Sequence, residues 1–250
     1  MLKVRVLPTL LFKDFGLVKG VRFDSRRRVG SVVQSVKVYN AREVDELVFL
    51  DIAATLDRRA PDFDTVDDVA DECFMPLTVG GGVRDVDHVR RLLQVGADKV
   101  ALNTAAVEDP QLVRDASAAF GSQCVVVSID ARRRDGGHEV VIRAGSAPTG
   151  RDPAEVAVAL ERAGAGEILL TSIDQDGTLE GYDLDLVRSV AGAVGIPVIA
   201  SGGAGTYAHM LEALQAGASA VAAASMFHFT EQTPLEAKRH LAAAGVPVRL

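Results

Sequence analysis

The sequence predicts an α/β fold, a closed (β/α)8 barrel, and three observations indicate it. Short apolar segments alternate with longer segments rich in Ala, Leu, Arg and Glu that have helical spacing. Eight such apolar segments occur, which is the number of strands in a barrel of this kind. No low-complexity block or Pro/Ser-rich linker interrupts the alternation, so we expect residues 1–250 to form one domain.

The predicted strands follow one another in an even rhythm. Most of the intervals hold a segment with helical spacing, of which 86–95 and 183–193 are the clearest. The interval that follows the first strand, 12–31, is expected to be a long loop. In chain order the predicted strands are VRVLPTL (4–10), ELVFLDI (46–52), PLTVGG (76–81), KVALNT (99–104), VVVSID (125–130), EILLTSI (167–173), PVIASGG (197–203) and AVAAAS (220–225).

Composition limits the kinds of partner. The chain has 250 residues, 48% of them hydrophobic, and a formal net charge of −7, which gives no general attraction to nucleic acid or to anionic membranes. No apolar run approaches the roughly 20 residues that span a bilayer, and the start lacks a signal-peptide pattern, so a cytoplasmic protein is expected. Cys73 and Cys124 lie in unrelated segments and are interpreted as core thiols. The five histidines lack metal-motif spacing, so neither a metal nor a cofactor is predicted.

An internal repeat divides the chain into two similar halves. Glycines end a predicted strand at 80–82 and again at 202–203. The same spacing relates Gly82 to Gly203, Thr104 to Ser225 and Glu46 to Glu167. We interpret the barrel as two half-barrels with a phosphate site each, suited to a substrate with a phosphate at both ends. The alternative is that the repeat only preserves turn geometry.

Residues at the carboxyl ends of barrel strands are the candidates for binding and chemistry. Glycines and small polar side chains there present backbone N–H groups to an anion, although glycines at strand ends also serve simply as turn formers. The predicted phosphate-binding residues are Gly82, Asn103 and Thr104 for one site, and Asp176, Gly177, Gly203, Ala224 and Ser225 for the other.

Carboxylates at the same ends are candidates for acid or base catalysis. Asp130 is the strongest, and its alternative role is to cap backbone N–H groups. Asp51 is a second candidate, and Thr171 and Ser201 also lie around the predicted mouth. In the 12–31 loop, Lys19 is a candidate for contact with an anionic substrate, whereas the arginines at 26–28 are more typical of a solvated run.

Charged residues at the strand starts predict a cluster in the barrel floor. Strand alternation places Lys99 on the same face as Asn103, and Glu167 on the same face as Thr171. An inward lysine and glutamate need partners, which Arg5 and Glu46 can supply. The alternative is an ordinary set of surface ion pairs.

Eight segments carry a resemblance to a known family: ELVFLDI, TVGGGVRD, GADKVALNTAAVEDP, FGSQCVVVSIDA, RAGAGEILLTSIDQDGT, GYD, PVIASGGAG and FHF. Together they resemble the cyclase subunit of imidazole glycerol phosphate synthase, a TIM-barrel family, over nearly the whole chain. The resemblance implies a glutaminase partner at the barrel floor, ammonia passage through the core, and a bisphosphorylated small-molecule substrate at the mouth. It implies that Arg5, Glu46, Lys99 and Glu167 gate ammonia, that Asp98 and Gln123 lie near the glutaminase interface, and that Asp130 is one of two catalytic aspartates. We expect Lys99→Ala or Asp98→Ala to impair glutamine-dependent activity with little loss of stability.

The second catalytic aspartate of that family is absent, because Leu11 stands where it is expected. Leucine cannot transfer a proton. This departure resembles a divergent branch in which the barrel and its glutaminase deliver ammonia to a separate sugar amidotransferase that turns an acetamido into an acetamidino sugar. The alternatives are an active cyclase of histidine biosynthesis and an isomerase on the same kind of barrel, and Leu11 counts against both.

Overall fold

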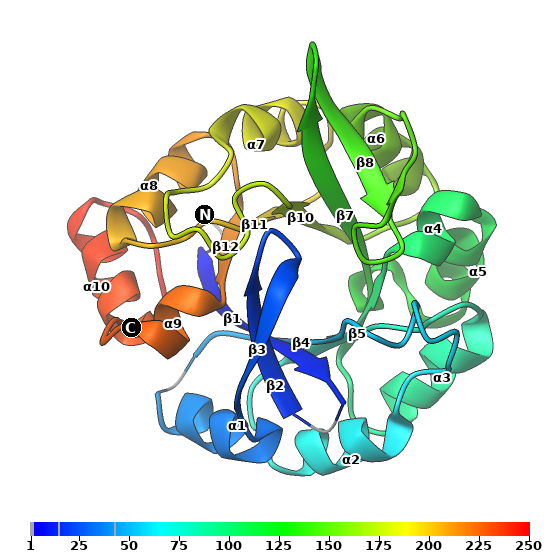
Figure 1. Ribbon diagram of the computed structural model, residues 1–250, viewed down its shortest axis with the longest axis horizontal. Helices are drawn as coiled ribbons and strands as arrows, with labels where there is room; N and C mark the ends of the chain where they lie inside the picture. Colours follow the sequence, from blue (N-terminus) through cyan, green and yellow to red (C-terminus); the bar gives the residue numbers. More distant parts are fainter. Residues whose placement is uncertain (1–2, 15, 43) are drawn as a thin grey trace.

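The computed structural model describes residues 3–14, 16–42 and 44–250, and its centre is a closed barrel of eight parallel strands (Figure 1). The order around the barrel follows the chain, and pairing of β10 with β7 completes the circle. All eight predicted strands are confirmed as barrel strands. They are β1 (Arg5–Lys13), β4 (Leu47–Asp51), β5 (Leu77–Gly80), β6 (Lys99–Leu102), β7 (Val125–Arg134), β10 (Glu167–Ser172), β11 (Val198–Ser201) and β12 (Ala220–Ala223).

Helices surround the barrel on the outside (Figure 1). The two clearest helical segments of the sequence are confirmed as α3 and α7. No helix within the described residues is long and apolar enough to cross a membrane. The helices are α1 (Val32–Ala41), α2 (Phe63–Asp71), α3 (Val86–Gln94), α4 (Thr104–Glu108), α5 (Gln111–Phe120), the 3-10 turn η1 (Ser122–Cys124), α6 (Pro153–Arg162), α7 (Leu184–Ala191), α8 (Tyr207–Gln215), α9 (Ser225–Phe229) and α10 (Pro234–Ala243).

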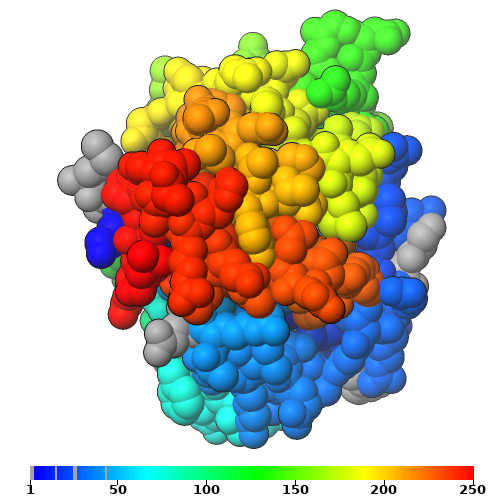
Figure 2. Space-filling view, turned by 90° about the vertical axis from the view of Figure 1, so that its left-hand side faces the viewer, coloured from blue at the N-terminus to red at the C-terminus, as the bar shows by residue number. Residues whose placement is uncertain are grey.

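Side-chain caps fix where several of the helices begin. Asp85 accepts a hydrogen bond from the backbone of His88 at the start of α3, and Asp183 does the same for Leu186 at the start of α7. Such a cap satisfies a backbone N–H that the helix itself leaves unpaired. In Figure 2 the C-terminal segment (red) lies between the α8 region (gold) and the α1 region (blue), so the last unit of the barrel packs beside the first.

Two hairpins extend from the barrel. The 12–31 segment, predicted as a loop, instead forms β2 (Gly16–Val21) and β3 (Asp24–Gly30), which continue antiparallel from β1. This correction has a physical reason: β2 pairs with the end of β1 and places Leu17 and Val18 in the core. The second hairpin joins β7 to β8 (Gly137–Ile142), which pairs with the short β9 (Ala147–Pro148), and it projects beyond the helices (Figure 1).

The interior of the barrel is an apolar section between two polar ends. It is formed by inward-facing residues of seven strands, because alternate residues of a barrel strand point inward. Both cysteines are half-buried rather than core residues, and both are free thiols. The apolar section comprises Leu7, Val48, Ala101, Val126, Leu169, Ile199, Ala220 and Ala222.

Candidate active site

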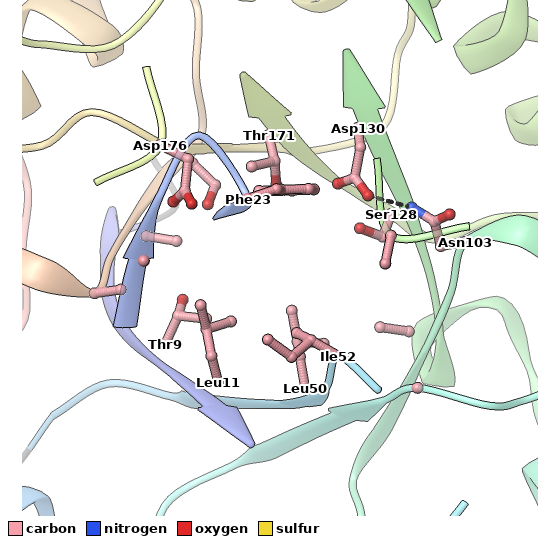
Figure 3. Close-up of a pocket in the computed structure, with 18 of the residues that line it drawn as sticks. Thr9, Leu11, Phe23, Leu50, Ile52, Asn103, Ser128, Asp130, Thr171 and Asp176 are labelled. Carbon is pink, nitrogen blue, oxygen red and sulfur yellow. Dashed lines mark hydrogen bonds between the residues drawn. The ribbon is translucent and has the colours of Figure 1, made fainter. Parts of the chain in front are cut away.

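A cavity opens at the carboxyl ends of the barrel strands, where the sequence predicts the site (Figure 3). It brings together every predicted catalytic and phosphate-binding residue except Lys19. These residues come from seven of the eight barrel strands or from the loops that follow them. The predicted residues in its wall are Asp51, Gly82, Asn103, Thr104, Asp130, Thr171, Asp176, Gly177, Ser201, Gly203, Ala224 and Ser225.

The two predicted phosphate sites lie in matching places of the two half-barrels. Gly82 has a φ of 72° and Gly203 a φ of 106°, values that L side chains rarely adopt. A Cβ atom on Gly203 would lie 2.0 Å from the carbonyl oxygen of Gly181, so a side chain does not fit there. Close beside these glycines, α4 begins at Thr104 and α9 at Ser225. The geometry fits the prediction of two anion sites, which stays a prediction.

Asp130 is buried in the cavity wall on β7. Its Oδ2 accepts a hydrogen bond of 2.8 Å from Asn103 Nδ2 (Figure 3). Burial raises the pKa of Asp130 from 3.8 to about 7, and hydrogen bonds from Asn103 and Thr171 limit that rise. A carboxyl group with such a pKa can both give and take a proton near neutral pH. The strand does not end at Asp130, as the sequence suggested, but continues to Arg134.

Strand register shows what stands opposite Asp130 in the other half-barrel. Thr171 pairs with Asp130 between β10 and β7, and Leu50 pairs with Leu11 between β4 and β1. Because β4 and β10 are equivalent strands of the two halves, Leu11 is the counterpart of Asp130. Ala224 is likewise the counterpart of Asn103. One side of the cavity, where β6 and β7 end, therefore presents the hydrogen-bonded acid Asp130. The opposite side, formed by β12, β1 and β4, presents Leu11, Leu50 and Ala224.

Asp51 is occupied by contacts within the chain. Its Oδ1 accepts hydrogen bonds of 3.0 Å from the backbone N–H groups of Ala53 and Ala54. Its Oδ2 lies 2.6 Å from Arg59 Nη2. These contacts hold the loop after β4 in place. Asp51 lines the cavity, but its geometry is that of a loop anchor.

Lys19 is placed differently from the expectation. It lies on β2, is 2% exposed and does not line the cavity. Its Nζ donates a 2.7 Å hydrogen bond to the backbone oxygen of Thr9. Burial lowers the pKa of Lys19 to about 7, against the opposing charge of Asp176. In this structure Lys19 fastens the β2–β3 hairpin to β1 rather than reaching an anion in the cavity.

The arginine run lies on β3. The Arg27 guanidinium lies 4.7 Å from the centre of the Phe229 ring, a cation–π contact that joins the hairpin to α9. The side chain of Arg26 lies outside the part of the chain that the structure describes.

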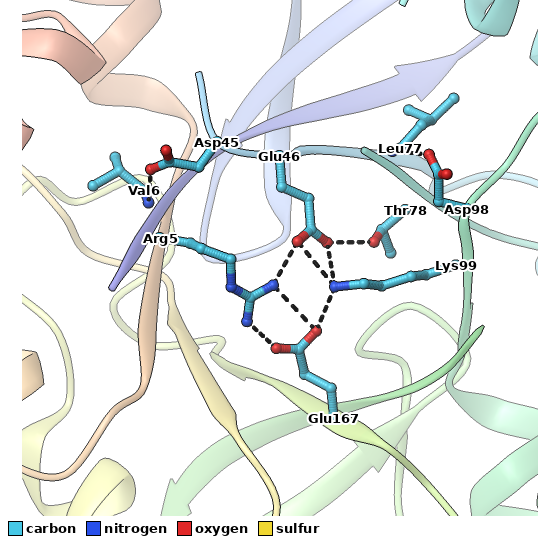
Figure 4. Close-up of polar contacts among 9 residues, drawn as sticks. All are labelled: Arg5, Val6, Asp45, Glu46, Leu77, Thr78, Asp98, Lys99 and Glu167. Carbon is cyan, nitrogen blue, oxygen red and sulfur yellow. Dashed lines mark hydrogen bonds and ion pairs between the residues drawn. The ribbon is translucent and has the colours of Figure 1, made fainter. Parts of the chain in front are cut away.

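At the opposite end of the barrel, four charged side chains form a closed ring, called here the floor ring: Arg5, Glu46, Lys99 and Glu167 (Figure 4). Each cation contacts both carboxylates. Lys99 Nζ lies 2.9 Å from Glu46 Oε2 and 2.9 Å from Glu167 Oε2. The Glu46 side chain is 2% exposed, so these are not ordinary surface ion pairs. Burial disfavours the charge on Arg5, yet its contacts with Glu167 and Glu46 raise the pKa of its guanidinium above the usual value.

The model of the family described as "Histidine biosynthesis protein" matches residues 5–233. The chain belongs to this family. As a member of the histidine biosynthesis protein family, the chain is a TIM-barrel enzyme of histidine-biosynthesis type.

The family match leaves the predicted roles of individual residues as predictions. Asp98 and Gln123 are exposed. Asp98 Oδ2 accepts a 2.8 Å hydrogen bond from the backbone N–H of Leu77 (Figure 4), and Gln123 Nε2 donates to the backbone oxygen of Phe120 at 3.1 Å. Both lie beside the starts of barrel strands, at the end that holds the floor ring. Their place is compatible with a partner interface at the floor.

Sequence reasoning missed three polar residues of this histidine biosynthesis family barrel. Thr78 donates a 2.7 Å hydrogen bond to Glu46 Oε1 and so extends the floor ring. Thr9 and Ser128 lie in the cavity wall at equivalent positions of β1 and β7. A signal was present: all three follow the inward alternation of their strands, and Thr9 and Ser128 lie two positions from Leu11 and Asp130.

Proposed function

We propose that this chain is a homologue of the cyclase subunit of imidazole glycerol phosphate synthase that receives ammonia from a glutaminase partner through its barrel. We further propose that it does not cyclise, and that it supports the amidation of a surface sugar, acetamido to acetamidino, by a separate amidotransferase. The observation that carries the proposal is the asymmetry of the cavity: Asp130 has an apolar counterpart in Leu11.

The asymmetry bears on chemistry through proton transfer. Cyclisation with acid and base on opposed halves needs a proton-transfer group on each, and removal of one commonly lowers the rate by about 10² to 10⁴. Leu11 offers none, and its neighbours Leu50 and Ala224 offer none in its place. The residues predicted for both phosphate sites line the cavity, so binding of a bisphosphorylated ligand and loss of the reaction are compatible.

The floor ring supports the glutaminase partner. Four buried or half-buried charges in the end wall of a barrel are costly to desolvate, and the same volume could hold apolar side chains. Their retention fits a gate whose ion pairs open when a partner binds. The exposed Asp98 and Gln123 beside it supply polar contacts for that partner.

A second candidate function is an active cyclase of histidine biosynthesis, and one observation favours it. Asp130, whose pKa burial raises to about 7, is suited to act as acid and base in turn. Thr171 and Ser201 in the same cavity supply hydroxyl groups to a substrate.

The deciding experiment measures the ammonia-dependent cyclase rate of the purified chain with the bisphosphorylated imidazole precursor. Leu11→Asp restores a carboxyl group, and Leu11→Asn is the matched control of similar size without an ionisable group. We expect no measurable turnover for the unaltered chain, a gain of about 10² or more for Leu11→Asp, and no gain for Leu11→Asn. Rapid turnover by the unaltered chain would establish the cyclase and refute the divergent role.

The glutaminase partner is tested separately. The glutaminase encoded nearest to this chain is mixed with it, and glutamine hydrolysis is measured with and without the barrel. We expect the barrel to bind and stimulate the glutaminase, and Asp98→Ala to weaken both effects. Hydrolysis that is indifferent to the barrel would refute an ammonia-conducting complex.

A further inference from the structure

Two hydroxyl groups face each other across the base of the cavity. Thr9 lies on β1 and Ser128 on β7, the first and fifth strands of the barrel circle, and Figure 3 shows them on opposing walls. Register makes them counterparts, because Thr9 pairs with Val48 and Ser128 pairs with Leu169, the equivalent residues of β4 and β10. The two halves differ one step higher, at Leu11 and Asp130, but at this level both keep a hydroxyl.

The Thr9 hydroxyl has no partner within the described residues. Thr9 is 5% exposed, and its Oγ1 makes no hydrogen bond. Lys19 uses the backbone oxygen of Thr9 and leaves the side chain unsatisfied. Leaving a buried hydroxyl unsatisfied destabilises the fold, so natural proteins seldom keep one without a ligand or water as its hydrogen-bond partner. Since Thr9 lines the cavity, its partner is expected to come from the cavity or from the barrel axis.

The apolar section below Thr9 and Ser128 determines which molecule can reach these hydroxyl groups along the barrel axis. Two residues below Thr9 on β1 is Leu7, and two residues below Ser128 on β7 is Val126, both in the apolar section. Along a strand that step is roughly 7 Å, and the floor ring begins one further step down with Arg5. An ion that enters the apolar section loses far more hydration free energy than a small neutral molecule does, so the neutral molecule passes more readily. The two hydroxyls are the first polar side chains that such a molecule meets on these strands.

We propose that Thr9 Oγ1 and Ser128 Oγ form a receiving site for neutral ammonia where it leaves the apolar section of the barrel and enters the cavity. This inference rests on the proposed passage of ammonia through the barrel. Each hydroxyl oxygen can accept an N–H of ammonia, which leaves the nitrogen lone pair free to point up into the cavity. Ammonia is thereby retained beside the acceptor instead of being diluted into bulk water.

The site is tested on the full chain without a glutaminase, using ammonia itself as the probe. Threonine γ-methyl groups are labelled with ¹³C, and Thr9→Val, which removes the hydroxyl but keeps the shape, identifies the Thr9 signal by its disappearance. Ammonium chloride is titrated at a pH near the pKa of ammonium and again well below it, with potassium chloride as the salt control. We expect a saturable shift of the Thr9 methyl signal that follows the concentration of neutral ammonia.

Matched variants give the specificity. Ser128→Ala should weaken the apparent affinity by about 2- to 10-fold, the loss of one neutral hydrogen bond. Ser172→Ala is the control: Ser172 is also buried with an unpartnered hydroxyl, yet it does not line the cavity, and its removal should leave the titration unchanged. A Thr9 signal that does not shift, shifts equally with potassium chloride, or ignores Ser128→Ala overturns the receiving site.

A failure of the receiving site can be told apart from a failure of the proposed function. Ammonia bound at Thr9 by a barrel that does not stimulate any glutaminase would refute the function and keep the site. A barrel that couples to a glutaminase but shows no saturable Thr9 shift would keep the function and refute the site.

Discussion

Replacing Lys99 by methionine tests whether the floor ring acts as one unit. The substitution keeps most of the side-chain length and removes the charge. In the intact ring, Lys99 and Arg5 each contact both carboxylates. After the change, Glu46 and Glu167 share Arg5 alone. The ring geometry therefore alters the expectation from sequence that the loss of Lys99 leaves stability largely intact.

The size of the expected stability loss follows from the burial of the ring and from the contacts that Arg5 still makes. Breaking a buried ion pair by removing one partner costs about 3–5 kcal/mol. The Glu46 and Glu167 side chains are 2% and 8% exposed, but the Lys99 side chain is 20% exposed and Arg5 still contacts both acids. We therefore expect a loss of about 2–4 kcal/mol. For a chain of this size each kcal/mol lowers the melting temperature by about 2–4 °C, so the shift is roughly 5–15 °C.

The assay is a double-mutant cycle by chemical denaturation. Lys99→Met, Glu46→Gln and the double variant are compared with the unaltered chain. The double variant leaves Arg5 paired with Glu167, so it should be less destabilised than the sum of the single variants by about 1 kcal/mol or more. Strict additivity of the two losses, or a Lys99→Met loss below about 0.5 kcal/mol, would refute a coupled ring and leave four charges that act independently.

Two further predictions concern the cavity. Burial raises the pKa of Asp130 to about 7, so the folded state binds this proton more tightly than the unfolded chain does. The proton therefore contributes to the free energy of unfolding in full below pH 3.8, and this contribution is lost as the pH rises to about 7. Asp130→Asn should flatten that part of a curve of denaturation midpoint against pH, and an unchanged curve would mean a solvated carboxylate. Gly203→Ala should abolish binding of a bisphosphorylated ligand, measured by calorimetry, because its Cβ would meet the Gly181 oxygen. Gly30→Ala, where a Cβ meets nothing within 4 Å, should bind normally, and equal binding by both variants would remove Gly203 from the phosphate seat.

The barrel could be predicted from sequence because its strands bury their apolar residues in a regular order. The β2–β3 hairpin could not, because its turn residues carry no recognisable signal. Arg22 and Phe23 both have positive φ, at 54° and 62°, in a two-residue turn where Asn-Gly is the usual sequence. The β7–β8 hairpin did have a signal, since Asp135 and Gly136 form its turn and Asp-Gly is a strong hairpin marker.

Some residues of the candidate site could be predicted from the sequence and others could not. Strand alternation was enough to predict the floor ring and most of the cavity wall, because inward-facing positions follow from register. The burial of Lys19 depends on the hairpin that covers it, and the Arg59 contact of Asp51 depends on how the loop after β4 folds. The local sequence does not predict either of these tertiary contacts.

The pairing of a hydrogen-bonding wall with an apolar wall also has a consequence for how a ligand lies. The two predicted phosphate seats are related by the pseudo-symmetry of the halves, so by themselves they would accept an elongated bisphosphate in either of two opposite orientations. Only one of these turns the ligand's amide and hydroxyl groups toward Asn103 and Asp130 and its less polar side toward Leu11 and Leu50. The reversed orientation buries polar groups against leucine without partners. The nearly symmetric cavity would therefore bind such a bisphosphate in one of its two orientations.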